Sequence, residues 1–103
     1  MKIRIKTTFI PLISTWDDLP DGVTLIPQRA IEKRSDGYGF AEGVLTFVSG
    51  VSVSIIGAWI YDKIKEVKDK PQVWIKINEK IVRQIDEDSI TEAIQREIEI
   101  SKK

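Results

Sequence analysis

The sequence contains neither cysteine nor histidine among its 103 residues, and each absence excludes a class of chemistry. A chain without cysteine forms no disulfide, no thiolate metal site and no thiol redox switch. A chain without histidine has no imidazole base and no histidine-ligated zinc. Its 16 basic residues balance 16 acidic residues, so the excess positive charge typical of nucleic-acid-binding domains is also missing. We therefore expect a protein that is not an enzyme, that needs no cofactor or metal, and that does not bind nucleic acid.

The residues that are present predict one folded domain over 1–103. Hydrophobic residues make up 42% and charged residues 31% of the chain, which is a globular rather than a disordered composition. A chain of 103 residues is close to the commonest domain size and is long enough for one modest core. The first residues alternate between charged and apolar, which is not the pattern of a signal peptide. We expect the protein to be cytoplasmic.

The charged residues lie on either side of a block that has none. Residues 1–43 carry six basic and six acidic side chains, residues 62–103 carry ten of each, and Val44–Tyr61 carries none. We expect this block to form the first two-thirds of an apolar helix over about 41–67, which ends in an amphipathic, charged tail. The polar, glycine-containing residues 28–43 are expected to form a long loop before it.

Two interpretations of the uncharged block remain open. Its eighteen residues, 44–61, approach the ~20 apolar residues that cross a bilayer, so a small single-pass membrane protein is one alternative. Serine, threonine and glycine dilute its hydrophobicity, however, and a spanning helix would separate the predicted strands, which are too few on each side to fold alone. We therefore favour a helix that packs on the chain's own sheet.

Alternating patterns predict the strands of that sheet. Residues 2–9 alternate between basic and apolar, Val23–Ile26 is a short β-prone run, and Gln72–Ile77 alternates again. A short helical turn is expected at 14–18, with Trp16 packed inward. These elements predict an α+β fold with a mostly antiparallel sheet of about four strands. The long apolar helix packs on this sheet, and a short helix ends the chain.

The last strand is predicted to turn back as a hairpin, and the sequence allows two registers for it. A three-residue connection pairs Ile77 with Ile81 and Val73 with Ile85, which keeps the apolar side chains on one face. A two-residue turn would instead place Ile77 opposite Lys80. We prefer the three-residue connection, since a shift of one residue moves the whole apolar set to water.

Capping patterns explain most of the acidic clusters. Ser89–Glu92 has the spacing of a capping box and predicts the start of the last helix. The apolar stripe of this helix consists of Ile90, Ala93, Ile94 and Ile98. Asp17-Asp18 and Asp86–Asp88 are interpreted as residues that cap helix amides rather than as metal ligands.

Five side chains are candidates for contact with another protein. Trp74 is predicted to point away from the core beside Lys76 and Arg83, and an outward tryptophan is a typical interface anchor. Tyr38 and Phe40 of the glycine-containing segment are the other two candidates. A basic face on the first strand (Lys2, Arg4 and Lys6) is interpreted as a solvated surface that also protects an edge strand from unwanted pairing.

The combined pattern resembles a known kind of small domain. It consists of Gly37–Gly43, the apolar block Val44–Ile60, the charged tail Asp62–Lys70, and the final hairpin and helix. In this order it resembles the effector-associated constant component domains, which are found beside proteases, caspase-like proteins and other effectors in bacterial conflict systems. The resemblance implies a non-enzymatic adaptor in antiviral defence, with a protein partner and no catalytic residues. A phage-encoded inhibitor of such a system is the alternative, and self-association stays open.

Overall fold

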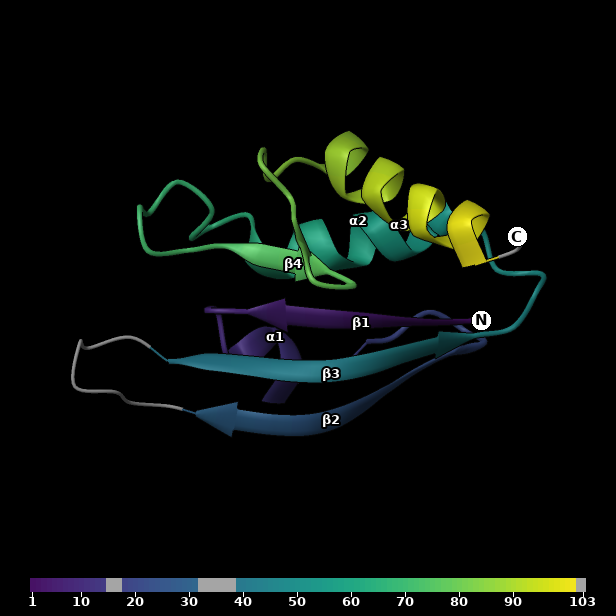
Figure 1. Cartoon of the computed structure of the whole chain (residues 1–103), viewed down its shortest axis with the longest axis horizontal. Coiled ribbons are helices and arrows are strands. Elements are labelled where there is room, and N and C mark those ends of the chain that lie inside the picture. The colour runs from purple at the N-terminus through teal and green to yellow at the C-terminus, as the bar shows by residue number, and fades with distance from the viewer. Residues whose placement is uncertain (15–17, 32–38, 102–103) are drawn as a thin grey trace.

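The computed structural model describes residues 1–14, 18–31 and 39–101. Within these residues the elements follow the order β-α-β-β-α-β-β-α (Figure 1). They are β1 (Lys2–Thr7), α1 (Pro11–Ser14), β2 (Val23–Ile31), β3 (Phe40–Phe47), α2 (Val53–Ile64), β4 (Ile75–Ile77), β5 (Lys80–Ile81) and α3 (Glu87–Ser101). The chain is therefore an α+β protein, as the sequence predicts.

The strands of the described residues form one sheet of five strands in the order β2-β3-β1-β4-β5, and every neighbouring pair is antiparallel. The sequence predicted about four strands and did not resolve the pairing. β1 lies in the centre, since it pairs with β3 over Lys2–Thr7 and with β4 over Ile5–Thr7. The predicted role of its basic residues as guards of an edge strand is therefore wrong. The ends of the described sheet are β2 and β5.

One face of the sheet carries the core. Ile3 and Ile5 of β1, Leu45 of β3 and Ile75 of β4 are at most 2% exposed. All described helices contribute to the same cluster, in which Ile60 of α2 is fully buried. Figure 1 shows α2 and α3 side by side near β4, while α1 lies against β2 and β3. The result is a two-layer molecule in which the opposite face of the sheet carries no described helix.

The predicted apolar helix over 41–67 is wrong in its first half. Residues 40–47 form β3, in which buried side chains alternate with half-buried ones. The chain then turns at Ser49-Gly50, and α2 occupies only Val53–Ile64. The uncharged block therefore combines two elements. The inward face of a strand is apolar, and on the outward face of this strand Val44 and Thr46 are also uncharged. The strand and the following helix therefore appear in the sequence as one uncharged run.

Gly43 marks a close approach between β3 and its neighbours. A Cβ atom at this position would lie 3.1 Å from Leu25 of β2 and 3.3 Å from Ile13 of α1. A residue without a side chain therefore lets α1 approach the sheet. In the described part of the chain, no helix is both long and apolar enough to cross a membrane. Residues 44–61 do not form the single helix that the membrane alternative required.

The predicted loop over 28–43 is also wrong at both ends. β2 continues through Pro27 to Ile31, with a bulge between Pro27 and Arg29, and β3 begins at Phe40. Proline has no amide hydrogen to donate, and a position in a terminal strand of the sheet tolerates that loss. Tyr38, Trp16 and Asp17 lie outside the described residues.

The hairpin adopts the register that the sequence analysis rejected. Ile77 lies opposite Lys80, and the amide of Val82 donates to the carbonyl of Ile75 at 2.9 Å. Asn78 and Glu79 form the two-residue turn with φ angles of 50° and 70°, the left-handed conformation of a type I′ turn. The predicted Ile77–Ile81 and Val73–Ile85 pairs are therefore wrong. Lys80 is tolerated opposite Ile77 because its side chain is 62% exposed to water, and its ammonium also pairs with a carboxylate on α3.

The last helix begins earlier than the capping-box pattern predicted. α3 starts at Glu87, and the Oδ1 atom of Asp86 accepts a hydrogen bond from the amide of Ser89 at 2.7 Å. Asp86 is thus the capping residue, which confirms that this acidic cluster serves the helix start. The predicted stripe is confirmed, since Ile90, Ile94 and Ile98 are buried and Ala93 is partly buried against the core.

Candidate protein-interaction face

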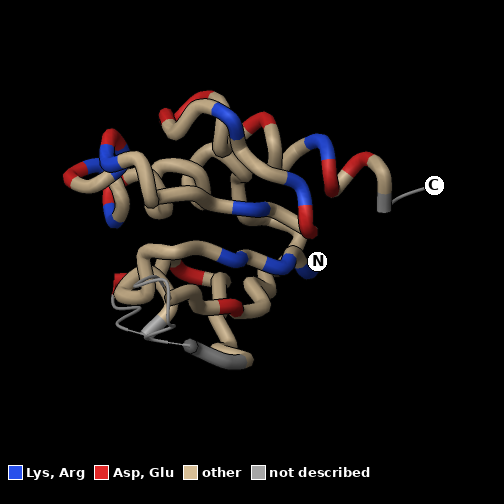
Figure 2. Tube along the Cα trace, turned by 60° about the vertical axis from the view of Figure 1, so that its left-hand side comes forward, with Lys and Arg blue, Asp and Glu red and all other residues tan. Residues whose placement is uncertain are grey.

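The outward face of the sheet, called the open face below, is the candidate site. Because strand residues alternate between two faces, the positions next to buried residues project here. Those on β1 and β4 are basic: Lys2, Arg4, Lys6 and Lys76. In Figure 2 basic positions follow these strands, whereas acidic positions recur along the C-terminal helix. β2 and β5 add Ile26 and Ile81, which are 50% and 53% exposed.

Two aromatic rings at one end of the open face each hold a lysine. The Nζ atom of Lys6 lies 4.6 Å from the centroid of the Phe40 ring, and that of Lys76 lies 5.2 Å from the Trp74 ring. Lys6 and Lys76 are directly opposite each other on β1 and β4. Two like charges in such a pair repel each other, and the cation–π contacts offset this repulsion.

The backbone of Trp74 is firmly attached to β1. Its amide donates to the Oγ1 atom of Thr8 at 2.9 Å, and its carbonyl accepts from the Thr7 hydroxyl at 2.9 Å. The Thr8 amide also donates to this carbonyl at 3.3 Å. These bonds fix where the partly exposed indole ring leaves the sheet, so the ring is presented by a rigid element.

The other end of the open face is hollowed. A depression of about 470 Å³ lies where β4 has ended and β1 continues. Its lining consists of Lys2, Ile3, Arg4, Val44, Asn78 and Glu79. Within it, the Arg4 guanidinium lies 4.0 Å from the Glu79 carboxylate, and both side chains are more than half exposed. Such a long, exposed ion pair is weak, so Arg4 remains available to another anion.

A carboxylate that the sequence analysis missed supports this end of the sheet. Glu97 of α3 is 8% exposed, and it accepts hydrogen bonds from the Lys80 ammonium at 2.9 Å and the Asn78 amide at 3.2 Å. Asn78 in turn accepts from the Arg4 amide at 2.8 Å. The Lys80 hydrogen bond, helped by Asn78, lowers the pKa of Glu97 against the opposing effect of burial. In the sequence Glu97 is one of several hydrophilic residues in a row, and its partners Asn78 and Lys80 lie about twenty residues away. The sequence therefore did not predict these contacts.

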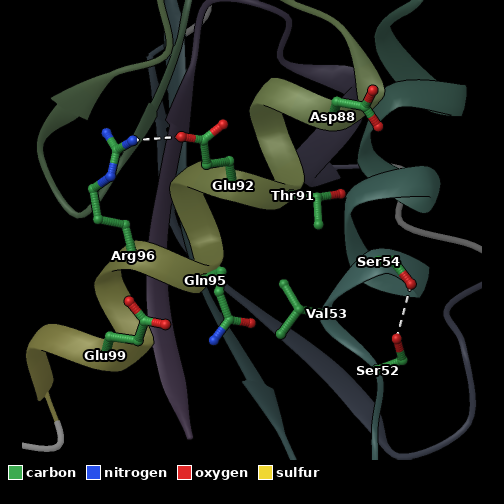
Figure 3. Close-up of a pocket in the computed structure, with 9 residues that line it drawn as sticks. All are labelled: Ser52, Val53, Ser54, Asp88, Thr91, Glu92, Gln95, Arg96 and Glu99. Atoms are coloured by element: carbon green, nitrogen blue, oxygen red, sulfur yellow. Dashed lines mark hydrogen bonds and ion pairs between the residues drawn. The ribbon is translucent and has the colours of Figure 1, made fainter.

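The helix layer carries a second depression, shown in Figure 3. It has a volume of about 600 Å³ and lies between α3 and the start of α2. Its residues are Ser52, Val53, Ser54, Asp88, Thr91, Glu92, Gln95, Arg96 and Glu99. Glu92 pairs with Arg96 at 2.7 Å, and both side chains are about two-thirds exposed. The described residues contain no group of acidic side chains placed to hold a metal ion.

The structure brings together three of the five predicted contact residues. Trp74, Lys76 and Phe40 lie around β1 on the open face. Arg83 follows β5 and lines a separate hollow with residues of α3, and Tyr38 lies outside the described residues. Comparison of the chain with protein-family models, with curated proteins and with solved structures found no match in any of the three.

Proposed function

We propose that the protein is a non-enzymatic protein-interaction module, an adaptor or regulator in a bacterial antiviral defence system, and that it binds its partner through the open face. The observation that carries the proposal is the pair of rings, Trp74 and Phe40, on the sheet face opposite the helices. Aromatic side chains on a rigid support contribute most of the binding energy in many protein interfaces. Exposed Ile26 and Ile81 extend the apolar part of the same face.

The defence role rests on the sequence pattern, which resembles that of small adaptor domains found beside bacterial effectors. A module of this kind works by contact and needs no catalytic groups, which agrees with the chain's lack of cysteine and histidine. The genes next to this one supply the first test. An effector such as a protease or a caspase-like protein encoded beside it supports the proposal, whereas a position within a phage genome favours an inhibitor instead.

The contact itself is tested by comparing one variant on each face of the molecule. Trp74→Ser removes a ring from the open face, and Ile55→Ser removes an apolar side chain that is 50% exposed on α2. Both proteins are used as bait for the neighbouring gene product after their melting curves have been compared. We expect binding to be lost in Trp74→Ser and retained in Ile55→Ser. Equal binding by Trp74→Ser and the wild-type protein contradicts a role for the open face.

The biological role is tested by phage challenge. In a strain that lacks the gene, we expect the wild-type protein and Ile55→Ser to restore resistance, and Trp74→Ser to leave the strain sensitive. Resistance that does not depend on the gene at all contradicts the adaptor proposal.

A further inference from the structure

We propose that the partner segment recognised by the open face is acidic and extended, with its carboxylates on Lys2, Arg4, Lys6 and Lys76. This inference rests on the proposed function and names the chemistry of its partner. Among the side chains that the structure describes, these four cations share the open face with two carboxylates, Glu42 and Glu79. The face therefore carries an excess of positive charge on a chain whose total formal charge is zero.

Basic residues elsewhere in the described chain mostly have acidic partners. Lys65 pairs with Asp62 at 2.9 Å, Lys80 with Glu97 at 2.9 Å, and Arg96 with Glu92 at 2.7 Å. On the open face, by contrast, Lys6 and Lys76 contact rings, and the nearest carboxylate in register is Glu42, opposite Lys6 on β3. A carboxylate that reaches either ammonium can therefore bind without displacing an existing ion pair.

The shape of the face favours an extended occupant. β1 pairs with β3 from Lys2 onward but with β4 only from Ile5 onward, and the Arg4 backbone bonds to the turn residue Asn78. Lys2 and Ile3 therefore extend past the hairpin on that side. The depression that contains Lys2 and Arg4 begins there. An extended segment placed along β1 from this depression passes Arg4 and then Lys6, and the charged positions recur at every second residue, the repeat of a strand.

A nucleic acid fits the same face less well. Bases bind to open sheets by stacking on aromatic rings, and here each ring already has an ammonium group over it. A carboxylate segment can bind the ammonium groups without moving them from the rings, so the partly exposed rings can still contact the same partner.

The α3 helix of a second copy is another possible acidic occupant of the open face. Its outward residues include Glu87, Asp88 and Glu99. Docking of α3 on the open face would join two unlike surfaces, and such contacts form open chains unless the rotation closes. We therefore infer that the occupant of the open face is an acidic segment of a separate protein.

The test measures binding of a synthetic oligo-glutamate peptide to the full chain by calorimetry at low ionic strength. An oligo-glutamine peptide and a single-stranded oligonucleotide serve as comparison probes. The variant is Lys6→Gln with Lys76→Gln, and its matched control is Lys65→Gln with Lys68→Gln, two lysines of the segment after α2. We expect the control to bind oligo-glutamate like the wild-type protein, and the open-face variant to bind about fivefold more weakly, because each exposed ion pair contributes roughly 0.5 kcal/mol.

Any one of the following results overturns the inference. The first is no binding of oligo-glutamate, or equal loss in both double variants. The second is tighter binding of the oligonucleotide than of the peptide. The third is self-association of the wild-type protein in light scattering that the Lys6 and Lys76 changes abolish, since the occupant is then a second copy. If binding of the neighbouring gene product depends on Trp74 but not on Lys6 and Lys76, the proposed function stands and an acidic partner segment is excluded.

Discussion

Glu97 on α3 and Lys80 on β5 form an ion pair of 2.9 Å that joins the helix layer to the last strand of the described sheet. The carboxylate is almost completely buried, while the lysine side chain is 62% exposed. The same carboxylate accepts a hydrogen bond from Asn78 in the hairpin turn. This one side chain thus connects the two-residue turn and β5 to the helix layer.

Replacement of Glu97 by glutamine should destabilise the protein in a pH-dependent way. The pKa of Glu97 is lowered in the folded state, so its contribution is fully present above the ordinary glutamate pKa and is lost as the pH falls through the lowered value. We expect Glu97→Gln to reduce the free energy of unfolding by about 1–3 kcal/mol near neutral pH. The difference from wild type should shrink in acid. Glu99→Gln, a substitution at an exposed position of the same helix, is the control. Denaturant titrations at neutral and at acidic pH measure the free energy of unfolding of each variant. A pH-independent difference would contradict this account.

The contact between α2 and α3 depends on Gly57. A Cβ atom here would collide with the side chain of Thr91, and the Thr91 Cα atom would be only 3.1 Å away. We expect Gly57→Ala to cost about 1–3 kcal/mol despite the better helix propensity of alanine, because the two helices must move apart. Gly50→Ala is the matched control, since nothing lies within 4 Å of a Cβ atom at that position. Thermal unfolding of the two variants compares them. A Gly57→Ala protein as stable as Gly50→Ala would mean that the helices are not in close contact.

The turn residue Glu79 is held in a conformation that side chains disfavour. Its φ of 70° is left-handed, and glycine adopts this conformation without strain. We expect Glu79→Gly to raise the free energy of unfolding by about 0.5–1 kcal/mol. Glu79→Ala loses the same exposed contact with Arg4 without gaining the backbone freedom, so it should not stabilise the protein. Equal stability of the two variants in denaturant titrations would argue against the left-handed turn.

A pair of neighbouring substitutions distinguishes the strand at 40–47 from the helix that the sequence suggested. Leu45 is fully buried, whereas Val44 projects to the open face. We expect Leu45→Thr to cost about 2–3 kcal/mol, because it removes apolar volume and buries a hydroxyl. Val44→Thr should change stability by no more than about 0.5 kcal/mol. Single substitutions at each position from Ala41 to Phe47 should give large and small losses of unfolding free energy in alternation. Large losses at every third or fourth position would instead indicate a helix.

Local patterns predicted those parts of the fold that local rules decide. Alternation at 2–9 predicted β1, and the stripe through Ile90, Ile94 and Ile98 predicted α3, because one face of each is buried and the other is wet. The same reasoning failed at 40–47. There Glu42 is the only charged residue of the strand, and the open face otherwise carries Phe40, Val44 and Thr46, so no alternation of polarity marks the two faces.

The candidate site was predicted only as separate residues. Trp74 beside Lys76 was visible in the sequence, and so was the basic series on the first strand. Phe40 was placed in a loop, and nothing in the sequence joined it to Lys6. Their contact arises because β3 pairs with β1, two strands separated by more than thirty residues of chain.

The sequence by itself determined that the chemistry of cysteine and histidine is absent, that the chain builds an α+β domain, and where its first strand and last helix lie. These follow from composition and from short-range periodicity. Only the tertiary structure decided that β1 is central, that the uncharged block divides into β3 and α2, and that the hairpin has a two-residue turn. Each of these depends on a partner distant in the chain: β3 and β4 on either side of β1, Leu25 and Ile13 against Gly43, and Glu97 for Lys80. A local sequence pattern cannot predict these contacts, because the contacting residues come from distant parts of the chain.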